Sequence, residues 1–428
     1  MKYKLSNYNR VYSFENEQYL FNARTQALAK LSLEEAKQIS SKDLSGLPAD
    51  SPFLSELLYG GFILQDGMDE LELIRFEMQQ SRFQSRHLTL TIAPTADCNF
   101  RCVYCYEKGT YSHCKMSDET ADLLVRFVEG QAQSIQALSI CWYGGEPLLE
   151  MERIADLSKK FIEICEKNDI SYNASMITNG YLLSKKNVEK LNKTKVSMIQ
   201  VTLDGDKATH DQRRFLSDGQ GTYQTIIHNL SENYDQLPQV SLRVNIDKTN
   251  VDSLSRIREW IYENHMEEKI HPYPGHVQSI FDTYDSSTCL EVEEYSQIDF
   301  GFISEMPNHE RLLYPLRLFN CCQADTLLSA VIGCDGSIYR CWDDIGRQDR
   351  KTGTLKDGVE VNSVFLKYLM QDATQDQECR DCFYLPLCLG GCPHQWQKQK
   401  VCSRYKYTLD ERIQGFIQST QTNKPEAE

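Results

Sequence analysis

Three cysteines, Cys98, Cys102 and Cys105, stand together in a CxxxCxxC spacing directly after a β-prone run at 88–93. Thiolates at this spacing can wrap one 4Fe–4S cubane and bind three of its irons, whereas ordinary ferredoxin-type sites use four cysteines. The missing ligand leaves one iron open to a small molecule. Zinc is an alternative, although structural zinc sites favour four ligands and paired CxxC units. A disulfide beside a single thiol is a second alternative, and it is unusual in the cytosol.

Nine of the sixteen cysteines lie between 321 and 402. Seven of them form a regular pattern around Gly336 and the Gly-Gly pair at 390–391: Cys322, Cys341, Cys379, Cys382, Cys388, Cys392 and Cys402. A pair of zinc knuckles would explain the CxxC unit at 379–382. It explains seven cysteines behind an open cubane site less economically, so metal clusters are the favoured interpretation.

The composition excludes several classes of protein. The formal charge of −15 argues against a general nucleic-acid binder, which needs a basic face for phosphates. No stretch approaches the roughly 20 apolar residues of a membrane span, and the polar N-terminus has no apolar signal core. We therefore expect a cytoplasmic protein with no membrane and no nucleic-acid partner. In such a compartment, clustered cysteines favour metal or redox chemistry over disulfides.

Strands and helices alternate from residue 88 onward, which predicts a parallel sheet with helical crossovers and a partial barrel. The expected strands are 88–93, 138–143, 171–178, 196–203 and 240–247, and the expected helices are 118–133, 150–168, 184–193, 222–233 and 251–265. A hairpin is expected at 329–341, turning at Asp335-Gly336. No firm element is assigned to 266–320.

Polar and glycine-rich segments follow these strands, at the edge of such folds where catalytic groups sit. The segments are Gly144-Gly145-Glu146-Pro147, Thr178-Asn179-Gly180 and Asp204-Gly205. Glycine allows the backbone to approach a ligand closely, and the carboxylate of Glu146 could bind a cationic amine. We therefore expect one site at the carboxyl ends of the strands.

The CxxxCxxC loop resembles the signature of the radical S-adenosylmethionine (SAM) superfamily. The resemblance implies that SAM chelates the open iron and is cleaved to a 5′-deoxyadenosyl radical, which abstracts a hydrogen atom. His210-Asp211-Gln-Arg-Arg214 matches an HDxxR pattern, in which Arg214 would pair with the SAM carboxylate; Arg213 competes for this role, and a structural salt bridge is the alternative. By resemblance, the SAM-binding residues are Tyr104 (against adenine), Gly144, Gly145, Glu146, Thr178, Asn179, Thr202, Asp204 and Arg214. No catalytic acid or base is assigned.

The C-terminal cysteines resemble the SPASM extension of radical SAM enzymes that mature peptides and proteins. The resemblance implies two auxiliary 4Fe–4S clusters. Cys379, Cys382, Cys388 and Cys402 would hold the outer cluster, and Cys322, Cys341 and Cys392 would hold the inner one. Cys321, Cys334 or an open position remain alternatives for the fourth inner ligand. Four more cysteines fit neither set, and two of these, Cys141 and Cys165, are expected in the core.

The segment 1–87 is expected to be a small α+β domain, with a capping box at Ser32-Leu-Glu-Glu35. It is compatible with the winged-helix-like module that grips a leader peptide as an added edge strand in many peptide maturases. A structural extension of the barrel is the alternative. The remaining predicted regions are a radical SAM partial (β/α)6 barrel at 88–285, a bridging region at 286–320, a SPASM domain at 321–405, and a C-terminal helix with a polar tail at 406–428.

Three functions follow from these resemblances. The first is a radical SAM/SPASM maturase that forms a thioether or carbon–carbon cross-link in a ribosomally made (RiPP) precursor peptide, with flavodoxin or ferredoxin as reducing partner. The second is an anaerobic sulfatase maturase that makes formylglycine; the Asp that follows the second SPASM cysteine in those enzymes is Trp342 here, with Asp343 and Asp344 next. The third is a non-enzymatic zinc-binding adaptor.

Overall fold

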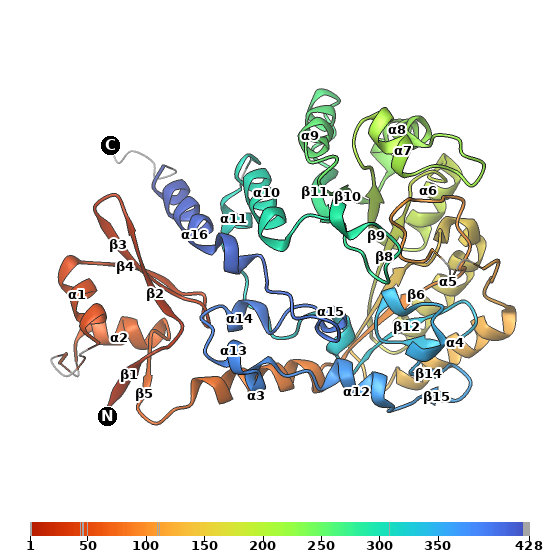
Figure 1. The fold of residues 1–428 in the computed structure, drawn as a ribbon. Helices are drawn as coiled ribbons and strands as arrows, with labels where there is room; N and C mark the ends of the chain where they lie inside the picture. The colour runs from red at the N-terminus through yellow and green to blue at the C-terminus, as the bar shows by residue number, and fades with distance from the viewer. Residues whose placement is uncertain are drawn as a thin grey trace. The chain divides into compact units, whose positions relative to one another are not determined.

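The computed structural model describes residues 2–422, apart from 43, 45, 46, 49, 109, 111 and 308. Contacts divide the chain into two compact units, whose elements are labelled in Figure 1. The barrel unit comprises Ser85–Glu291 and Thr326–Leu369, and the N-terminal unit comprises Met1–Gln84, Val292–Asp325 and Met370–Glu428. Within the described residues, no helix is both long and apolar enough to cross a membrane. The end of the predicted polar tail, 423–428, lies outside the described residues.

The barrel unit contains six consecutive parallel strands, as the predicted partial (β/α)6 barrel requires. They are β6 (His87–Ile92), β7 (Ala137–Trp142), β8 (Ser171–Thr178), β9 (Val196–Thr202), β10 (Gln239–Ile246) and β11 (Ile270–His276). Each pairs with the next, from β6–β7 to β10–β11, with a register shift between Ala174 and Ser175 in the β8–β9 pair. Apolar side chains such as Leu90, Ile140 and Leu242 are almost fully buried, as expected for a sheet covered by crossover helices.

Helices connect these strands, and several begin at a side chain that accepts a backbone N–H. They are α4 (Asp118–Gln131), α5 (Met151–Lys167), α6 (Lys185–Lys193), α7 (Lys207–Arg213), α8 (Tyr223–Glu232) and α9 (Ser253–Glu263). Ser117, Ser184 and Asp206 cap α4, α6 and α7. These caps satisfy donors that a helix start leaves unpaired.

One strand of the eight-stranded sheet, β11 (Ile270–His276), was not predicted, and the two strands of the predicted hairpin join the same sheet. The sequence of β11 contains Pro272 and Pro274, and β11 lies at the edge of the sheet, where proline is tolerated. At the other side, β12 (Ser329–Ile332) pairs parallel with β6, and β13 (Ile338–Tyr339) pairs antiparallel with β12. The predicted hairpin at Asp335-Gly336 is confirmed. The pairing with β6 also assigns 326–369 to the barrel unit, which differs from the predicted SPASM boundary at 321–405. The remaining elements here are β14 (Gly353–Thr354), β15 (Gly358–Val359) and α12 (Ser363–Leu369).

The N-terminal unit begins with two small sheets and three helices. The strands are β1 (Tyr3–Leu5), β2 (Asn9–Phe14), β3 (Glu17–Asn22), β4 (Leu28–Leu31) and β5 (Ile63–Gln65), and the helices are α1 (Leu33–Ser41), α2 (Pro52–Tyr59) and α3 (Glu70–Phe83). The sheet order is β2-β3-β4, with β1 paired to β5. The predicted capping box at Ser32 and Glu35 is present at the start of α1.

The same unit contains the later segments that carry most of the C-terminal cysteines. They form α10 (Val292–Ser304), α11 (Glu310–Leu313), α13 (Gln377–Arg380), α14 (Leu385–Cys388), α15 (Pro393–Trp396) and α16 (Tyr405–Thr422). One hydrophobic core joins Tyr8 and Phe21 of the first segment to Leu385 and Leu387 of the cysteine loops and to Ile413 of α16. The first domain and these cysteine loops therefore fold as one body.

Candidate active site

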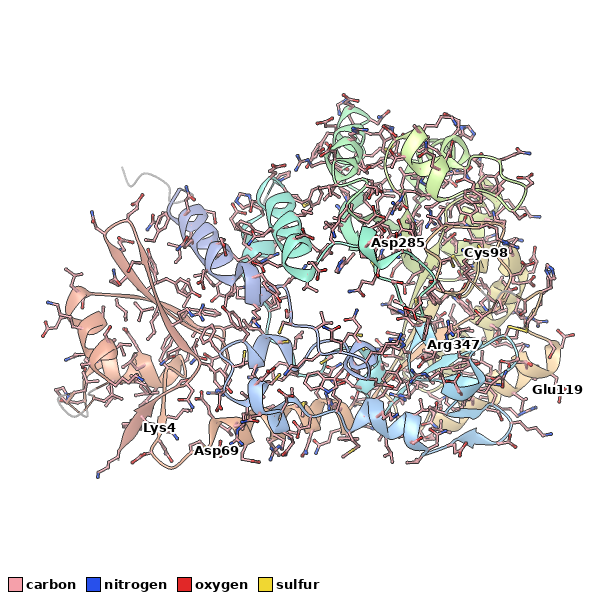
Figure 2. The ribbon with its side chains drawn as sticks, viewed as in Figure 1. Lys4, Asp69, Cys98, Glu119, Asp285 and Arg347 are labelled. Carbon is pink, nitrogen blue, oxygen red and sulfur yellow. A yellow bond between two sulfur atoms is a disulfide. The ribbon has the colours of Figure 1, made fainter. Side chains whose placement is uncertain are left out.

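The three cysteines of the CxxxCxxC motif occupy the loop after β6, at the carboxyl end of the sheet; Cys98 is labelled in Figure 2. This loop is held by backbone hydrogen bonds to the segment after α7, from Arg101 N to Phe215 O at 2.8 Å and from Val103 N to Arg213 O at 3.0 Å. The backbone N–H of Phe100 donates to Sγ of Cys98 at 3.4 Å. Such N–H donors favour a thiolate on the sulfur.

Burial raises the pKa of Cys98, with the carboxylate of Glu146 acting in the same direction. Burial also raises the pKa of Cys102, while the positive charge of Arg214 opposes it. Without a metal these thiols stay protonated at neutral pH, and a bound metal would remove the protons. In the described part of the chain, no three His, Cys, Asp or Glu side chains surround a single-ion position. A cubane distributes its ligands over separate irons, so three thiols of one loop fit it.

The predicted Gly144-Gly145 turn follows β7 and packs backbone to backbone on the start of the cysteine loop. Gly144 has a φ of +109°, and a Cβ there would lie 2.5 Å from the carbonyl oxygen of Thr95. A Cβ on Gly145 would lie 2.2 Å from the carbonyl oxygen of Asp97. The N–H of Glu146 donates to that same carbonyl at 2.9 Å. Only glycine fits these two positions, and the turn therefore fixes where the cysteine loop begins.

Glu146 connects this turn to the loop after β8. Its fully buried carboxylate accepts hydrogen bonds from Oγ1 of Thr178 at 2.7 Å, from the N–H of Asn179 at 2.7 Å and from the N–H of Leu148 at 3.0 Å. Burial raises the pKa of Glu146, and these donors oppose the rise. Asn179 also donates to Oδ1 of Asn99 at 2.8 Å. Glu146 thus positions a second loop; its binding of a SAM amine stays a prediction.

The two competing arginines of the HDxxR pattern have different surroundings. Arg213 forms salt bridges to Asp204 at 3.2 Å and to Asp247 at 2.7 Å. Arg214 is buried and donates from Nη1 to the hydroxyl of Tyr104 at 2.9 Å, while its buried Nε has no hydrogen-bond partner among the described residues. An orphaned guanidinium donor is costly unless a ligand satisfies it. Arg214, rather than Arg213, therefore retains a donor for a carboxylate.

Tyr104 and Asp204 meet in the same network. The Tyr104 hydroxyl donates to Oδ2 of Asp204 at 2.5 Å and accepts from Nδ2 of Asn245 at 2.9 Å. The predicted contact of Tyr104 with adenine is untested by these bonds. Thr202 is buried at the end of β9. Sequence reasoning missed Asn245 and Asp247, although both stand at the end of β10, the position that singled out Asp204 after β9.

A further group of side chains in the barrel unit combines Trp342 and Asp343 with three residues that the sequence analysis missed, Tyr106, Glu107 and Tyr143. Tyr106 and Tyr143 share a hydrogen bond between their hydroxyls, and Trp342 stacks on Tyr143 with ring centroids 5.6 Å apart. Burial raises the pKa of Glu107 to about 7, and the nearby charge of Asp343 adds to the rise. In the sequence, Tyr106 and Glu107 follow Cys105, Tyr143 precedes Gly144, and Trp342 and Asp343 follow Cys341. We call Tyr106, Glu107, Tyr143, Trp342 and Asp343 the aromatic–acidic wall.

Asp343 and Asp344 have different surroundings, although both were noted in the sequence. Asp344 is fully buried and accepts a hydrogen bond from the hydroxyl of Tyr368 at 2.6 Å. Asp343 instead contributes to the electrostatic surroundings of Tyr106 and Tyr143, whose pKa values are raised by burial first. Asp344 therefore has a structural contact, and Asp343 belongs to the aromatic–acidic wall.

The four cysteines predicted to bind the outer cluster all lie in the N-terminal unit. Burial raises the pKa of Cys388, and the nearby Cys402 and Cys382 add to the rise. Burial raises the pKa of Cys379 to about 12, with Asp376 and Cys388 acting in the same direction. Cys388 is thus an electrostatic neighbour of the other three cysteines. The binding of one cubane by these four thiols stays a prediction.

The predicted inner ligands are less completely grouped. Cys322 and Cys392 belong to the N-terminal unit and are electrostatic neighbours, and burial is the main cause of the raised pKa of Cys322. Cys341 belongs to the barrel unit. Sγ of Cys321 points to the carbonyl oxygen of Leu389 at 3.4 Å and is packed in the hydrophobic core. The inner ligand set therefore stays a prediction.

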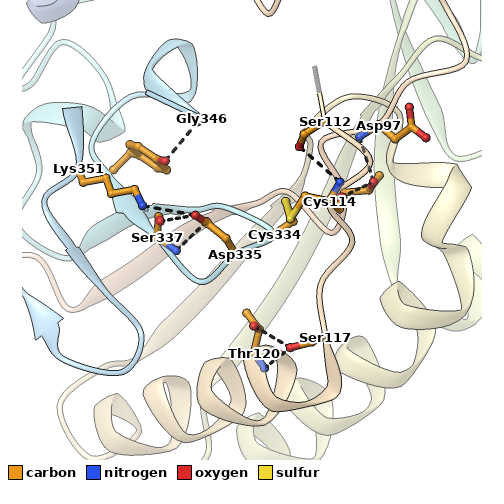
Figure 3. Close-up of a disulfide and its surroundings, with 12 residues drawn as sticks. Asp97, Ser112, Cys114, Ser117, Thr120, Cys334, Asp335, Ser337, Gly346 and Lys351 are labelled. Carbon is orange, nitrogen blue, oxygen red and sulfur yellow. Dashed lines mark hydrogen bonds and ion pairs between the residues drawn. A yellow bond between two sulfur atoms is a disulfide. The ribbon is translucent and has the colours of Figure 1, made fainter. Parts of the chain in front are cut away.

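One alternative for the fourth inner ligand is wrong in this structure. Cys334 forms a disulfide with Cys114, with their Cα atoms 6.2 Å apart (Figure 3). The bond joins the segment before α4 to the turn of the β12–β13 hairpin, beside the hydrogen-bonded Asp335 and Ser337. Cys334 cannot ligate iron while the bond is intact. The sequence analysis favoured metal or redox chemistry over disulfides for the clustered cysteines, and Cys334, one of the nine between 321 and 402, departs from that expectation.

Residues 92–261 match the model of the Radical SAM superfamily. The chain thus contains a radical SAM domain on the barrel just described, and it is a radical SAM enzyme whose cofactors are a 4Fe–4S cluster and SAM. This match covers the three cysteines, the Gly144-Gly145 turn and Arg214.

Two relatives of known name are similar to parts of this chain. A cysteine-type anaerobic sulfatase-maturating enzyme of Clostridium novyi is 21% identical over 365 residues, which cover 77% of this chain and 96% of that one. An Fe-coproporphyrin III synthase of Methanosarcina barkeri is 28% identical over 171 residues, 40% of this chain and 39% of that one.

Two solved structures have a similar fold. The enzyme anSMEcpe, with bound AdoMet and Cp18Cys peptide, superposes with a TM-score of 0.60 at 17% identity, over 77% of this chain and 99% of that one. Streptococcus suis SuiB, bound to precursor peptide SuiA, superposes with a TM-score of 0.53 at 14% identity, over 93% of this chain and 98% of that one. At these identities the similarity establishes the fold alone.

Proposed function

We propose that this protein is a radical SAM maturase that modifies a ribosomally made precursor peptide through a cross-link. The observation that carries the proposal is the N-terminal domain. SuiB matches 93% of this chain and anSMEcpe 77%, so the SuiB match must include part of residues 1–84. Within the described residues, β4 pairs with β3 on one side only. An exposed strand edge of this kind can add an extended leader peptide as a further strand.

In this proposal the residues of the barrel unit bind and orient the cofactors. Cys98, Cys102 and Cys105 would hold the cluster, and SAM bound to it supplies the radical that removes a hydrogen atom from the peptide. Arg214 would satisfy its orphaned Nε on the SAM carboxylate. The close packing of Gly144-Gly145 on Asp97 would keep the cysteine loop at a fixed place.

The aromatic–acidic wall is the proposed substrate-facing surface. Trp342 keeps 39% of its surface exposed while stacked on Tyr143. One face of the Trp342 ring therefore contacts Tyr143, and part of its remaining surface is accessible to a substrate. Glu107 and Asp343 add carboxylates at the same place. Asp343 would accept the proton that the substrate loses when its radical is oxidised, which is a task for a carboxylate within reach of the peptide.

Auxiliary clusters would complete the chemistry. The grouping of Cys379, Cys382, Cys388 and Cys402 supports an outer 4Fe–4S cluster, and Cys322, Cys341 and Cys392 would bind an inner one. Such clusters can accept the electron released when a cross-link forms. A flavodoxin or ferredoxin would reduce the SAM-bound cluster.

A sulfatase maturase is the second candidate, because the Clostridium novyi enzyme is matched over 96% of its length. The presence of Trp342 after Cys341, in place of an aspartate, counts against formylglycine formation.

Product analysis distinguishes the two candidates. The anaerobic, reconstituted enzyme is incubated with SAM, dithionite and either a candidate precursor peptide or a sulfatase-derived peptide with a central cysteine. We expect loss of two hydrogens from the first peptide and no change in the second. Conversion of the cysteine to formylglycine would favour the sulfatase maturase, and a Cys98→Ala/Cys102→Ala/Cys105→Ala variant is the control for radical chemistry.

A further inference from the structure

Helix α3, the last element of the N-terminal domain, contacts two later segments of the same unit. One segment includes Cys321 and Cys322, and the other precedes Cys379. Its apolar residues Ile74 and Met78 are buried in the core that includes the cysteine loops. On the adjoining face, Arg75 binds Asp372 at 3.2 Å, and Ser81 donates to Oδ1 of Asn320 at 3.0 Å. These contacts recur at the three- to four-residue spacing of one helix face. One face of α3 therefore supports the segments 317–325 and 371–376.

The deepest of these contacts is an ion pair between Arg82 and Asp325. The two side chains are 2% and 0% exposed, and Nη2 of Arg82 lies 2.8 Å from Oδ2 of Asp325. Arg82 also donates from Nη1 to the carbonyl oxygen of Gln371. The Asp325 carboxylate accepts the backbone N–H groups of Cys321 at 3.0 Å and of Cys322 at 3.2 Å. Besides the ion pair itself, Arg82 donates one hydrogen bond and Asp325 accepts two, so both buried charges have further polar contacts.

These bonds determine the direction of two adjacent thiols. Asp325 fixes the backbone of the Cys321–Cys322 turn through both amides, and the N–H of Ala324 donates to Sγ of Cys322 at 3.4 Å. Sγ of Cys321 is directed to the carbonyl oxygen of Leu389, within the core. The thiol of Cys322, in contrast, is an electrostatic neighbour of Cys392.

We propose that Arg82, acting through Asp325, is the positioning residue that presents Cys322 as a ligand of the inner auxiliary cluster. The inference rests on the proposed auxiliary clusters, and it gives the N-terminal domain a role besides peptide recognition. Arg82 of α3 supplies a positive charge. Without it, the carboxylate of Asp325, which binds the backbone of the Cys321–Cys322 turn, would be buried without its ion-pair partner. Residues that orient a metal ligand in this way contribute about 10–100-fold to metal affinity.

The test uses the anaerobically purified full-length protein and measures iron, sulfide and the rate of iron loss to a chelator. Because Arg82→Met alone leaves Asp325 buried without its partner, the main variant is Arg82→Met/Asp325→Leu, which replaces the pair by apolar side chains of similar size. Arg75→Met is the matched control: it lies on the same helix and removes a partly exposed ion pair to Asp372, while leaving the Arg82–Asp325 pair intact.

We expect about twelve irons in the wild type and in the control, and about eight in the double variant with unchanged circular dichroism. If the double variant binds some inner cluster, iron loss from it should be about tenfold faster or more. Full iron content with a wild-type loss rate in the folded double variant would overturn the inference. A wild type with only about four irons would instead refute the auxiliary clusters themselves, and the inference with them.

Discussion

Acidification should weaken the fold through one buried histidine, His210, whose ring must stay neutral in the barrel unit. Its Nδ1 accepts the backbone N–H of Asp204 at 3.1 Å, and its Nε2 lies 3.0 Å from Oγ1 of Thr222. Thr222 gives its own hydroxyl hydrogen to the carbonyl of Arg214, so Nε2–H is the donor to Thr222. A proton on Nδ1 would face the N–H of Asp204, and imidazolium is therefore disfavoured.

The electrostatic surroundings add to this effect. The pKa of His210 is lowered to about 4, mainly by burial; Arg214 and Arg213 act in the same direction, and Asp204 and Asp211 oppose them. In the unfolded chain the pKa of histidine is about 6.5. As the pH falls from 7 to 5, the unfolded chain therefore takes up a proton that the folded chain does not. The free energy of unfolding should fall by about 2 kcal/mol over this interval through His210 alone, and the loss should level off below about pH 4.

Urea denaturation at pH 7 and pH 5 measures this contribution when wild type and His210→Asn are compared. Asparagine can accept the Asp204 N–H through Oδ1 and does not titrate. Other acid-sensitive groups, including the cluster ligands, are common to both proteins and cancel in the difference. We expect the wild type to lose about 2 kcal/mol more than the variant. An equal pH dependence of the two proteins would refute the reasoning.

Three further predictions concern the site and its supports. Gly145→Ala should lower the iron bound by the first cluster, because its Cβ would lie 2.2 Å from the carbonyl of Asp97; an unchanged iron count and SAM cleavage would contradict this. Arg213→Met should lower the free energy of unfolding by about 3–5 kcal/mol, since it leaves buried carboxylates unpaired, and denaturation with urea measures it. Cys114→Ser/Cys334→Ser should destabilise the barrel unit by about 2–5 kcal/mol, because the bond closes a loop of 220 residues. Alkylation of both cysteines in the folded, unreduced protein would show that this bond does not form.

Local sequence patterns were sufficient for most of the barrel. The strand predicted at 171–178 is β8 with the same bounds, because alternating and β-branched residues identify a buried strand without knowledge of its neighbours. β11 was missed because Pro272 and Pro274 argue against a strand unless its place at the sheet edge is known. The pairing of β12 with β6 is equally non-local, and it explains why the barrel unit includes 326–369.

The candidate site could be predicted only in part, for the same reason. Local sequence patterns identified its motif residues, whereas contacts between distant segments were not predictable. The motif residues could be named because they directly follow strands, as Gly144 and Asp204 do. The partners of Arg213 and the stacking of Trp342 on Tyr143 depend on side chains brought together from distant segments. The Cys114–Cys334 disulfide could not be predicted either, because no local pattern relates two cysteines 220 residues apart.

The position of β12 also has a consequence for how the chain is synthesised and folds. β6 is the first strand of the sheet to leave the ribosome, but its second neighbour, β12, begins roughly 240 residues later. At about 5–20 residues per second, that edge of β6 stays unpaired for about 10–50 s after its own synthesis. An unpaired strand edge is a template for aggregation, and contacts this far apart in sequence form slowly. The nascent chain should therefore depend on chaperones, or on slow expression, until residues 329–332 have emerged.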